Sequence, residues 1–216
     1  MNGGETPSLS EHCWTFLRGL RDTLAYVGRP IKIIRHPYER WGELRLPDSV
    51  QSVLFVCRGN ICRSPLAEVY FQSLVQKQGR QMTVRSAGLD TTPGEPAHAK
   101  AQDIALQHRL SLDAHTTTMV HKELLDQSDL IIVMEISQKH HMHRLYPNTK
   151  GKVVLLGRFD SVGPLEIADP YGGTSEDFYS CFQQVSRCCD VLAARLGVKS
   201  REPSMRQILP VNPKNS

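Results

Sequence analysis

The stretch VLFVCRGNICRSPLAE, residues Val53–Glu68, combines three elements of a common architecture. Its first four residues form a short apolar run typical of a strand that is buried on both faces. Its end begins an apolar pattern with helical spacing that continues to Gly79. The loop between them, from Cys57 to Ser64, holds two cysteines, a glycine and an arginine. Such residues fit a redox pair, a metal clip, or a nucleophile beside a bound phosphate.

The rest of the chain repeats the alternation of apolar runs and helical patterns. Further strands are predicted at 82–85, 130–134 and 153–156, and helices at 97–109, 138–145 and 175–197. This order predicts an α/β fold, a small doubly wound four-stranded parallel sheet with helices on both faces. Ligands bind beyond the carboxyl ends of such strands, so the loop after the first strand is the predicted phosphate-binding loop.

Composition narrows the classes of function. The net charge of +4 over 216 residues is mild, and Lys and Arg are scattered, so no nucleic-acid partner is expected. The N-terminus is polar, and no apolar run approaches the ~20 residues that cross a bilayer, so a cytoplasmic location is expected. In that compartment the six cysteines are expected to be reduced, and Cys181, Cys188 and Cys189 to pack in the core.

Three segments are predicted along the chain. Residues 1–50 form an N-terminal extension, with an amphipathic helix in HCWTFLRGLRDTLAYVG and a short extended segment after it. Residues 51–197 form the main domain, and the polar tail 198–216 is expected to be disordered. The helix is expected to pack on the domain; contact with a membrane surface is the alternative, which its mixed charges disfavour.

The loop has the features of an anion site. Gly59 permits a tight turn, and Ser64 is predicted to cap a helix whose first residue is Pro65. Backbone N–H groups, the helix end and the Arg63 guanidinium would together surround a tetrahedral dianion. The same positive field favours the thiolate of Cys57. The Ser64 hydroxyl would both cap the helix and donate a hydrogen bond to that sulfur.

VCRGNICRSPLAE resembles the signature of the low-molecular-weight protein-tyrosine phosphatases. The resemblance continues through SAGL (86–89), LIIVM (130–134) and DPYGG (169–173). The sequence around the last two motifs looks more like the bacterial branch of the family than the animal branch. The resemblance implies that Cys57 attacks phosphorus to form a cysteinyl-phosphate, that Arg63 holds the equatorial oxygens, and that Asp169 is the general acid.

The resemblance also implies a set of substrate-binding residues. In the family an asparagine at the position of Asn60 pins the loop, and Tyr171 would stack on the substrate ring, while many members carry a second tyrosine at the position of Gly172. Cys62 would form a protective disulfide with the nucleophile under oxidation. No metal and no cofactor are implied. The predicted substrate-binding residues are Arg58, Gly59, Asn60, Ile61, Cys62, Ser64 and Tyr171.

Three other functions remain as alternatives. An arsenate reductase of this fold would use relay cysteines in the middle of the chain, and none lies between Cys62 and Cys181. A protein-arginine phosphatase would carry a threonine-like residue where this chain has Ile61. A phosphotyrosine-binding module would need neither a thiolate nor an acid. The expected partner is a tyrosine-phosphorylated protein, either a bacterial tyrosine autokinase or a host protein.

Two features stand outside this scheme. The histidines of KHHMHR (139–144) have a spacing that could bind a metal, but a solvated helix face is the prediction. In HTTTMV (115–120), relatives from bacteria usually carry an arginine near the middle threonines, and the effect of its loss is not assigned.

Overall fold

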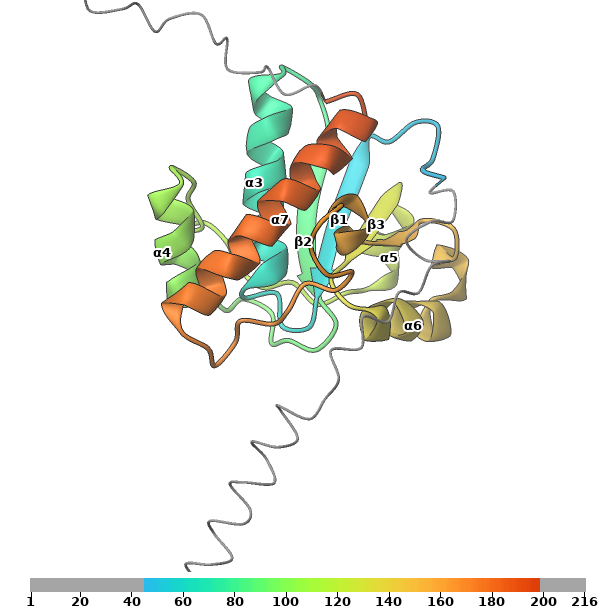
Figure 1. The fold of residues 1–216 in the computed structure, drawn as a ribbon. Coiled ribbons are helices and arrows are strands. Elements are labelled where there is room, and N and C mark those ends of the chain that lie inside the picture. The colour runs from blue at the N-terminus through green and yellow to red at the C-terminus, as the bar shows by residue number, and fades with distance from the viewer. Residues whose placement is uncertain (1–44, 199–216) are drawn as a thin grey trace, which may run out of the picture. The chain divides into compact units, whose positions relative to one another are not determined.

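The computed structural model describes residues 45–198, which form one α/β domain (Figure 1). Four parallel strands lie in the order β2-β1-β3-β4. The strands are β1 (Ser52–Cys57), β2 (Thr83–Gly88), β3 (Leu130–Val133) and β4 (Val153–Leu155). The helices are α3 (Arg63–Lys77), α4 (Ala99–Gln107), α5 (Lys122–Asp126), α6 (Ile136–Leu145) and α7 (Ser175–Arg195), with short 3-10 helices at Pro147–Thr149 and Leu156–Phe159. The predicted fold class is confirmed.

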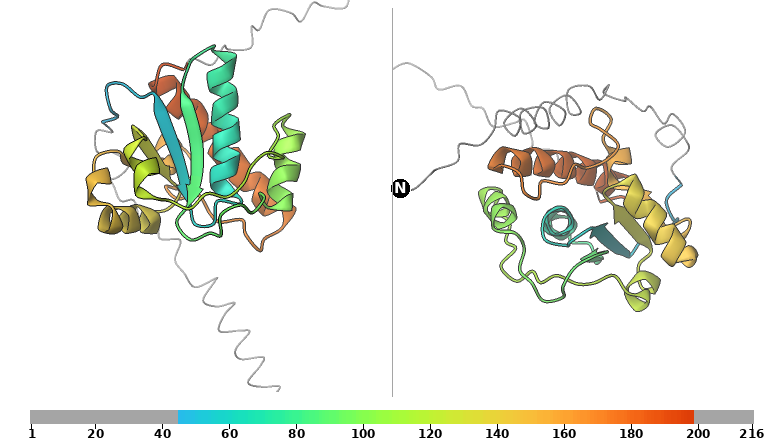
Figure 2. Two further views of the ribbon diagram at one scale, coloured as in Figure 1. Left: turned by 180° about the vertical axis from the view of Figure 1, so that it is seen from behind. Right: turned by 90° about the horizontal axis from the view of Figure 1, so that it is seen from below.

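The sheet is buried on both faces because its strand residues alternate between two apolar clusters. Phe55 and Ile132 pack with α3 and α7, where Phe71 and Val185 are fully buried. Leu54 and Ile131 face the other way, toward α5 and α6. Each buried side chain of this size contributes about 1.5–3 kcal/mol. The right-hand view of Figure 2 shows the sheet between these two layers of helices.

The strand β1 has β2 and β3 as its neighbours, and this position creates the topological switch point. The chain leaves β1 into α3 and then enters β2 on one side, whereas β3 and β4 lie on the other. The loop between Cys57 and Arg63 therefore opens at the carboxyl end of the sheet, where its neighbours diverge. This is the position that the sequence predicts for the phosphate-binding loop.

The predicted start of α3 is wrong by two residues. The helix begins at Arg63, with Cys62 at the N-cap position and no side-chain cap hydrogen bond, so Ser64 lies inside the first turn and Pro65 is the third helical residue. Ser64 is not a cap because its hydroxyl faces the loop, where it contacts Cys57 Sγ and accepts a hydrogen bond from Asn60 Nδ2. Pro65 is still tolerated, since the first N–H groups of a helix lack intrahelical partners.

The strand β2 extends further than predicted. The sequence SAGL was expected to begin a loop, but Ser86, Ala87 and Gly88 pair with Phe55, Val56 and Cys57 of β1. The backbone hydrogen bonds with the buried strand β1 thus outweigh the weak strand preference of these small residues. As a consequence, the end of β2 lies directly beside the start of the catalytic loop.

Helix α7 confirms the predicted core cysteines. Cys188 and Cys189 are fully buried, and Cys181 is 5% exposed. A capping box begins the helix, since Thr174 Oγ1 accepts from the Asp177 N–H and the Asp177 carboxylate accepts from the Thr174 N–H. Arg80 Nη1 donates to the carbonyl of Leu196 at the other end.

The ends of the predicted domain differ from the packed unit by a few residues. Val198, assigned to the disordered tail, is buried, and its N–H donates to the Ala193 carbonyl over 2.7 Å. Val50, assigned to the extension, is also buried. The predicted amphipathic helix and the segment after it lie outside the described residues, as does the tail beyond Val198. Among residues 45–198, no helix is both long and apolar enough to cross a membrane.

Candidate active site

The loop from Cys57 to Arg63 wraps around the Cys57 sulfur. The Asn60 N–H donates to Cys57 Sγ over 3.2 Å, and Ser64 Oγ lies 3.0 Å from the same sulfur. Ser64 Oγ accepts from Asn60 Nδ2, so its own proton can be donated to the sulfur, 3.0 Å away, or to the Ala87 carbonyl, 3.5 Å away. The sulfur also sits at the N-terminus of α3. Backbone dipoles and the hydroxyl thus favour a negative charge on it.

Asn60 holds the loop from behind. Its backbone has φ 53°, a left-handed conformation that asparagine tolerates better than most residues, and its side chain is fully buried. Besides Ser64, its Nδ2 donates to Ser86 Oγ, and its Oδ1 accepts from the Thr118 N–H. The His115 ring contacts the Asn60 carbonyl over 2.8 Å. Asn60 was predicted to bind substrate; its burial makes it a positioning residue.

The HTTTMV segment therefore has a structural role at the site. The Thr118 N–H and the His115 ring both contact Asn60, so the segment lies directly behind the catalytic loop. Glu68 lies next to it, where its carboxylate accepts from Ser86 Oγ and lies 3.9 Å from the His115 ring. Burial raises the pKa of Glu68 above its ordinary value, although the Ser86 hydrogen bond opposes this shift.

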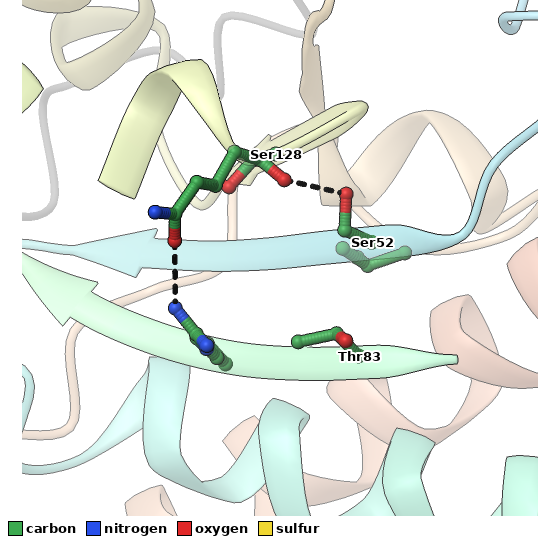
Figure 3. A pocket seen from close by; sticks show the side chains of 6 residues that line it. Ser52, Thr83 and Ser128 are labelled. Atoms are coloured by element: carbon green, nitrogen blue, oxygen red, sulfur yellow. Dashed lines mark hydrogen bonds between the residues drawn. The ribbon is translucent and has the colours of Figure 1, made fainter. Parts of the chain in front are cut away.

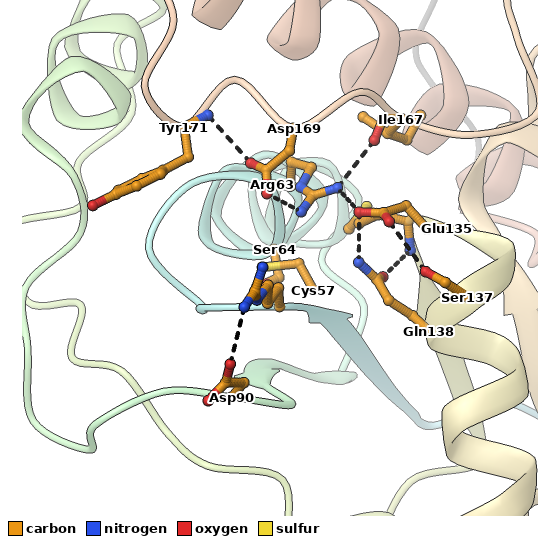
Figure 4. A network of polar contacts seen from close by, with 12 residues as sticks. Cys57, Arg63, Ser64, Asp90, Glu135, Ser137, Gln138, Ile167, Asp169 and Tyr171 are labelled. Atoms are coloured by element: carbon orange, nitrogen blue, oxygen red, sulfur yellow. Dashed lines mark hydrogen bonds and ion pairs between the residues drawn. The ribbon is translucent and has the colours of Figure 1, made fainter.

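Arg63 lies at the base of the cleft with its side chain only 1% exposed. Its Nη1 binds Glu135 Oε1 and the Ile167 carbonyl, and its Nη2 donates to Asp169 Oδ2 over 2.5 Å (Figure 4). Burial acts to lower the pKa of Arg63, but the charge of Cys57 and the contacts with Glu135 and Asp169 outweigh it and raise the pKa. The guanidinium is therefore permanently charged.

The sequence did not predict Glu135, which anchors Arg63. Its carboxylate accepts from Gln138 Nε2 over 2.9 Å and from Ser137 Oγ over 3.1 Å, as Figure 4 shows. It follows β3 after one residue, just as Cys57 ends β1. Polar residues at the carboxyl ends of adjacent parallel strands meet at one edge of the sheet, and that rule could have identified Glu135.

A cleft of about 290 Å³ opens above the sulfur. Eight of the ten predicted site residues line it, and Asp90, which was not predicted, lines it as well. Asn60 and Ser64 lie buried beneath the loop, and Tyr171, 66% exposed, stands at the rim. The lining residues are Cys57, Arg58, Gly59, Ile61, Cys62, Arg63, Asp90, Asp169 and Tyr171.

The rim at Tyr171 is supported by a neighbouring ring. His98 packs against Tyr171 edge-on, with ring centroids 5.9 Å apart, and stacks on Phe178 at 4.9 Å. The His98 N–H donates to the Ile61 carbonyl, so the start of α4 is joined to the catalytic loop. Asp169 Oδ1 accepts from the Tyr171 N–H over 3.2 Å, which fixes the turn that carries both residues.

Cys62 is buried beside this cleft, 2% exposed. Burial, reinforced by the negative charges of Asp169 and Cys57, raises the pKa of its thiol to about 12. Cys62 is therefore a neutral thiol at physiological pH.

Another hollow, of about 120 Å³, lies near the amino end of β1 (Figure 3). Ser52 Oγ donates to the Gln127 carbonyl there, and Arg85 Nη1 donates to Gln127 Oε1 over 3.2 Å. The residues that line it, Ser52, Val53, Thr83, Arg85, Gln127 and Ser128, include no thiol and no carboxylate. The chemistry thus gathers at the opposite end of the strands.

The histidines of 139–144 lie on α6, away from the cleft. His140 is exposed, and His141 and His143 are half-buried. Within residues 45–198, no group of three or more His, Cys, Asp or Glu side chains is arranged to hold a metal ion. Burial, together with nearby Lys139 and Lys150, lowers the pKa of His143.

Solved structures share this fold. The tyrosine phosphatase Wzb from Escherichia coli K30, in complex with sulphate, matches with a TM-score of 0.64 and 32% identity over 68% of this chain and 99% of that one. A YwlE mutant from Bacillus subtilis matches with a TM-score of 0.64 and 26% identity, over 68% and 99% of the two chains. The domain thus corresponds to essentially the whole of each neighbour.

Curated sequences agree. The low molecular weight protein-tyrosine-phosphatase Wzb of Escherichia coli K12 is 38% identical over 139 residues, which is 63% of this chain and 88% of that protein. The human low molecular weight phosphotyrosine protein phosphatase is 35% identical over 147 residues, 65% and 92% of the two chains. These identities are too close to separate the bacterial branch from the animal one. Residues 52–202 match the family described as low molecular weight phosphotyrosine protein phosphatase, and the chain belongs to that family.

Proposed function

We propose that this protein is a protein-tyrosine phosphatase, which hydrolyses phosphotyrosine on proteins through a cysteinyl-phosphate intermediate. One observation carries the proposal. The Cys57 sulfur accepts a backbone hydrogen bond inside a loop that ends at the buried, charged Arg63, and the Asp169 carboxylate is in contact with that arginine. Nucleophile, anion holder and acid thus lie in one cleft.

The first step forms the bond between Cys57 sulfur and phosphorus. The loop N–H groups and the Arg63 guanidinium hold the equatorial oxygens of the phosphoryl group as charge spreads over them. Arg63 Nε is buried and has no hydrogen-bond partner among the described residues, so it is an available donor for one of those oxygens. The contact with Glu135 keeps the guanidinium in place during this step.

Asp169 then serves the leaving group. In the free site its carboxylate lies against Arg63, and the phosphoryl oxygens compete for the same guanidinium. Displaced toward the rim, the protonated Asp169 donates its proton to the departing phenolate oxygen while the P–O bond breaks. Its carboxylate afterwards takes a proton from the water that attacks the phosphocysteine; the S–P bond breaks, phosphate is released and the Cys57 thiolate is restored. Ser64 stabilises the departing sulfur.

The position of Ile61 favours phosphotyrosine over phosphoarginine. It lines the cleft beside Cys62, and its carbonyl is fixed by the His98 N–H. A branched apolar side chain there suits the flat face of a phenyl ring. Two YwlE arginine phosphatases are among the solved neighbours, at 27% and 30% identity, so phosphoarginine is included as a substrate in the experiment below.

The substrates proposed are tyrosine-phosphorylated proteins, with a bacterial tyrosine autokinase or a host protein as candidates. The reaction requires Cys57 in its reduced form, and the five cysteines of the described residues are all free thiols. A reducing compartment suits this chemistry, so we place the protein in the cytoplasm.

The test compares phosphotyrosine and phosphoarginine peptides as substrates of the wild-type protein, Cys57→Ser and Asp169→Ala. We expect turnover of phosphotyrosine, none with Cys57→Ser, and a loss of about 10²–10³ in kcat with Asp169→Ala. For nitrophenyl phosphate, whose leaving group needs less protonation, the Asp169→Ala loss should be smaller. Full activity of Cys57→Ser, or a preference for phosphoarginine, would overturn the proposal.

A further inference from the structure

The mouth of the cleft holds an arginine that the mechanism does not use. Arg58 directly follows Cys57 and lines the cleft, and its side chain is 74% exposed. Its Nη2 lies 3.4 Å from Asp90 Oδ2, and the Asp90 side chain is equally exposed. Figure 4 shows Asp90 across Cys57 from the Arg63–Asp169 contact.

The position of Asp90 is fixed by the backbone. Its N–H donates to the Arg58 carbonyl over 2.9 Å, and the Leu89 N–H donates to the Cys57 carbonyl over 3.0 Å. These bonds continue the β1–β2 ladder past the strand ends. The carboxylate is thus attached to a backbone held by hydrogen bonds, whereas the long Arg58 side chain reaches it through solvent.

The two arginines of the cleft differ in how firmly their acidic partners hold them. Arg63 is buried and held by both Glu135 and Asp169. Among the described residues, the acidic partner of Arg58 is Asp90, which is exposed and 3.4 Å away. An exposed ion pair of this kind stabilises the protein only weakly, because water screens its two charges. An incoming anion can therefore displace Asp90 from Arg58 at little cost, just as a phosphoryl group displaces Asp169 from Arg63.

We propose that Arg58 binds a carboxylate of the substrate next to the phosphotyrosine, so that the preferred substrates are phosphotyrosines in acidic segments. This inference rests on the proposed function. When the phosphoryl group is seated on Cys57 and Arg63, the peptide main chain crosses the mouth of the cleft, where Arg58 stands. Asp90 is an internal competitor: it occupies Arg58 in the free protein and repels acidic residues of the substrate.

The experiment uses the full chain and a set of phosphotyrosine peptides that differ only in having Glu, Gln or Lys at the positions flanking the phosphotyrosine. We expect the wild-type kcat/KM to be roughly two- to fivefold higher for Glu than for Gln, mostly through KM, with the difference shrinking as salt is added. Arg58→Gln should bring the ratio close to one. Asp90→Asn should raise it, because the competing carboxylate is gone.

The opposite signs of the two substitutions are the decisive result, since general damage to the loop would lower activity toward all peptides alike. Arg85→Gln makes the same change of charge on β2, outside the cleft, and should leave the ratio unchanged. Equal rates for Glu and Gln peptides, or shifts in the same direction for Arg58→Gln and Asp90→Asn, would overturn the inference. Absence of turnover on every phosphotyrosine peptide would instead overturn the proposed function.

Discussion

Asn60 and Ser86 stand 26 residues apart, yet Asn60 Nδ2 donates a hydrogen bond to Ser86 Oγ over 2.8 Å. The bond joins the catalytic loop to the end of β2. Together with the bonds to Ser64 and Thr118, it places the left-handed residue of the loop under three polar constraints. The shape of the phosphate site thus depends on a buried side chain that does not face the cleft.

Replacing Asn60 separates backbone strain from side-chain bonding. Asn60→Ala and Asn60→Gly both lose the three hydrogen bonds, so both should lower kcat/KM at least tenfold. Glycine adopts the left-handed conformation without steric cost, so Asn60→Gly should be about 1 kcal/mol more stable than Asn60→Ala. Urea unfolding measures the difference; equal stabilities would argue against strain at this position.

Glu135→Gln should weaken the hold on Arg63. The neutral amide removes one of the two charges that fix the buried guanidinium, and we expect kcat/KM to fall about 10- to 100-fold. Glu166→Gln is the matched control. Glu135 is at the N-cap position of α6, and Glu166 accepts a hydrogen bond from the Ile136 N–H at that same helix start without contacting Arg63. Comparable losses in the two variants would show that the helix start, rather than Arg63, is responsible.

Gly88→Ala should disturb the loop by crowding. A Cβ there would lie 2.8 Å from the Arg58 carbonyl oxygen and 2.9 Å from Thr91 Cγ2. We expect a loss of about 1–3 kcal/mol in the free energy of unfolding together with a loss of activity. Gly79→Ala is the control: it is strained by its φ of +61° but has open space around it, so it should reduce stability alone. An active, stable Gly88→Ala would contradict the close approach.

Cys62 should protect the nucleophile from oxidation. Peroxide converts the Cys57 thiolate to a sulfenic acid, and the Cys62 sulfur then displaces water to give a disulfide that thiols reduce. Because the Cys62 thiol has a pKa of about 12, it is not itself the target of the peroxide. Activity after peroxide and then dithiothreitol should return in the wild type and in Cys181→Ser, but not in Cys62→Ser. Equal recovery in all three would exclude the protective role.

Asp129 should contribute to the acid sensitivity of the fold. Hydrogen bonds from the Gln51 N–H and the Ser52 side chain lower its pKa below the ordinary value of 3.8. Between the lowered pKa of the folded protein and the ordinary pKa of the unfolded chain, the unfolded chain binds more protons. The stabilisation by Asp129 is therefore complete above the ordinary pKa and is lost as the pH falls through the lowered pKa of the folded protein. Urea midpoints of Asp129→Asn should fall less steeply with acid than those of the wild type; parallel curves would speak against the assignment.

Much of the fold could be predicted because the strands are continuous apolar runs. Residues 130–133 are all large and apolar, so they predict a strand buried on both faces, and β3 is one of the two inner strands of the sheet. The end of β2 could not be predicted in the same way, since Ser86, Ala87 and Gly88 have no strong strand preference and are held by their pairing with β1. The helix start at Arg63 likewise depends on the turning of the loop, which no local residue pattern records.

The candidate site divides along similar lines. Cys57, Arg63 and Asp169 were predicted because they stand in specific motifs, and the structure brings them into one cleft. Glu135 and Asp90 were missed because their importance depends on which residues meet across strand ends. Both follow strands closely, so a search for charged residues after each strand would have found them.

The burial of Arg63 has a consequence for the synthesis of the protein. Its two acidic partners come 72 and 106 residues later in the chain. A ribosome-bound chain that already contains the whole catalytic loop still lacks the counter-charges that hold its arginine, and contacts of such long range form late. We therefore expect the catalytic loop to be inactive during translation until the segment around Asp169 has emerged and folded.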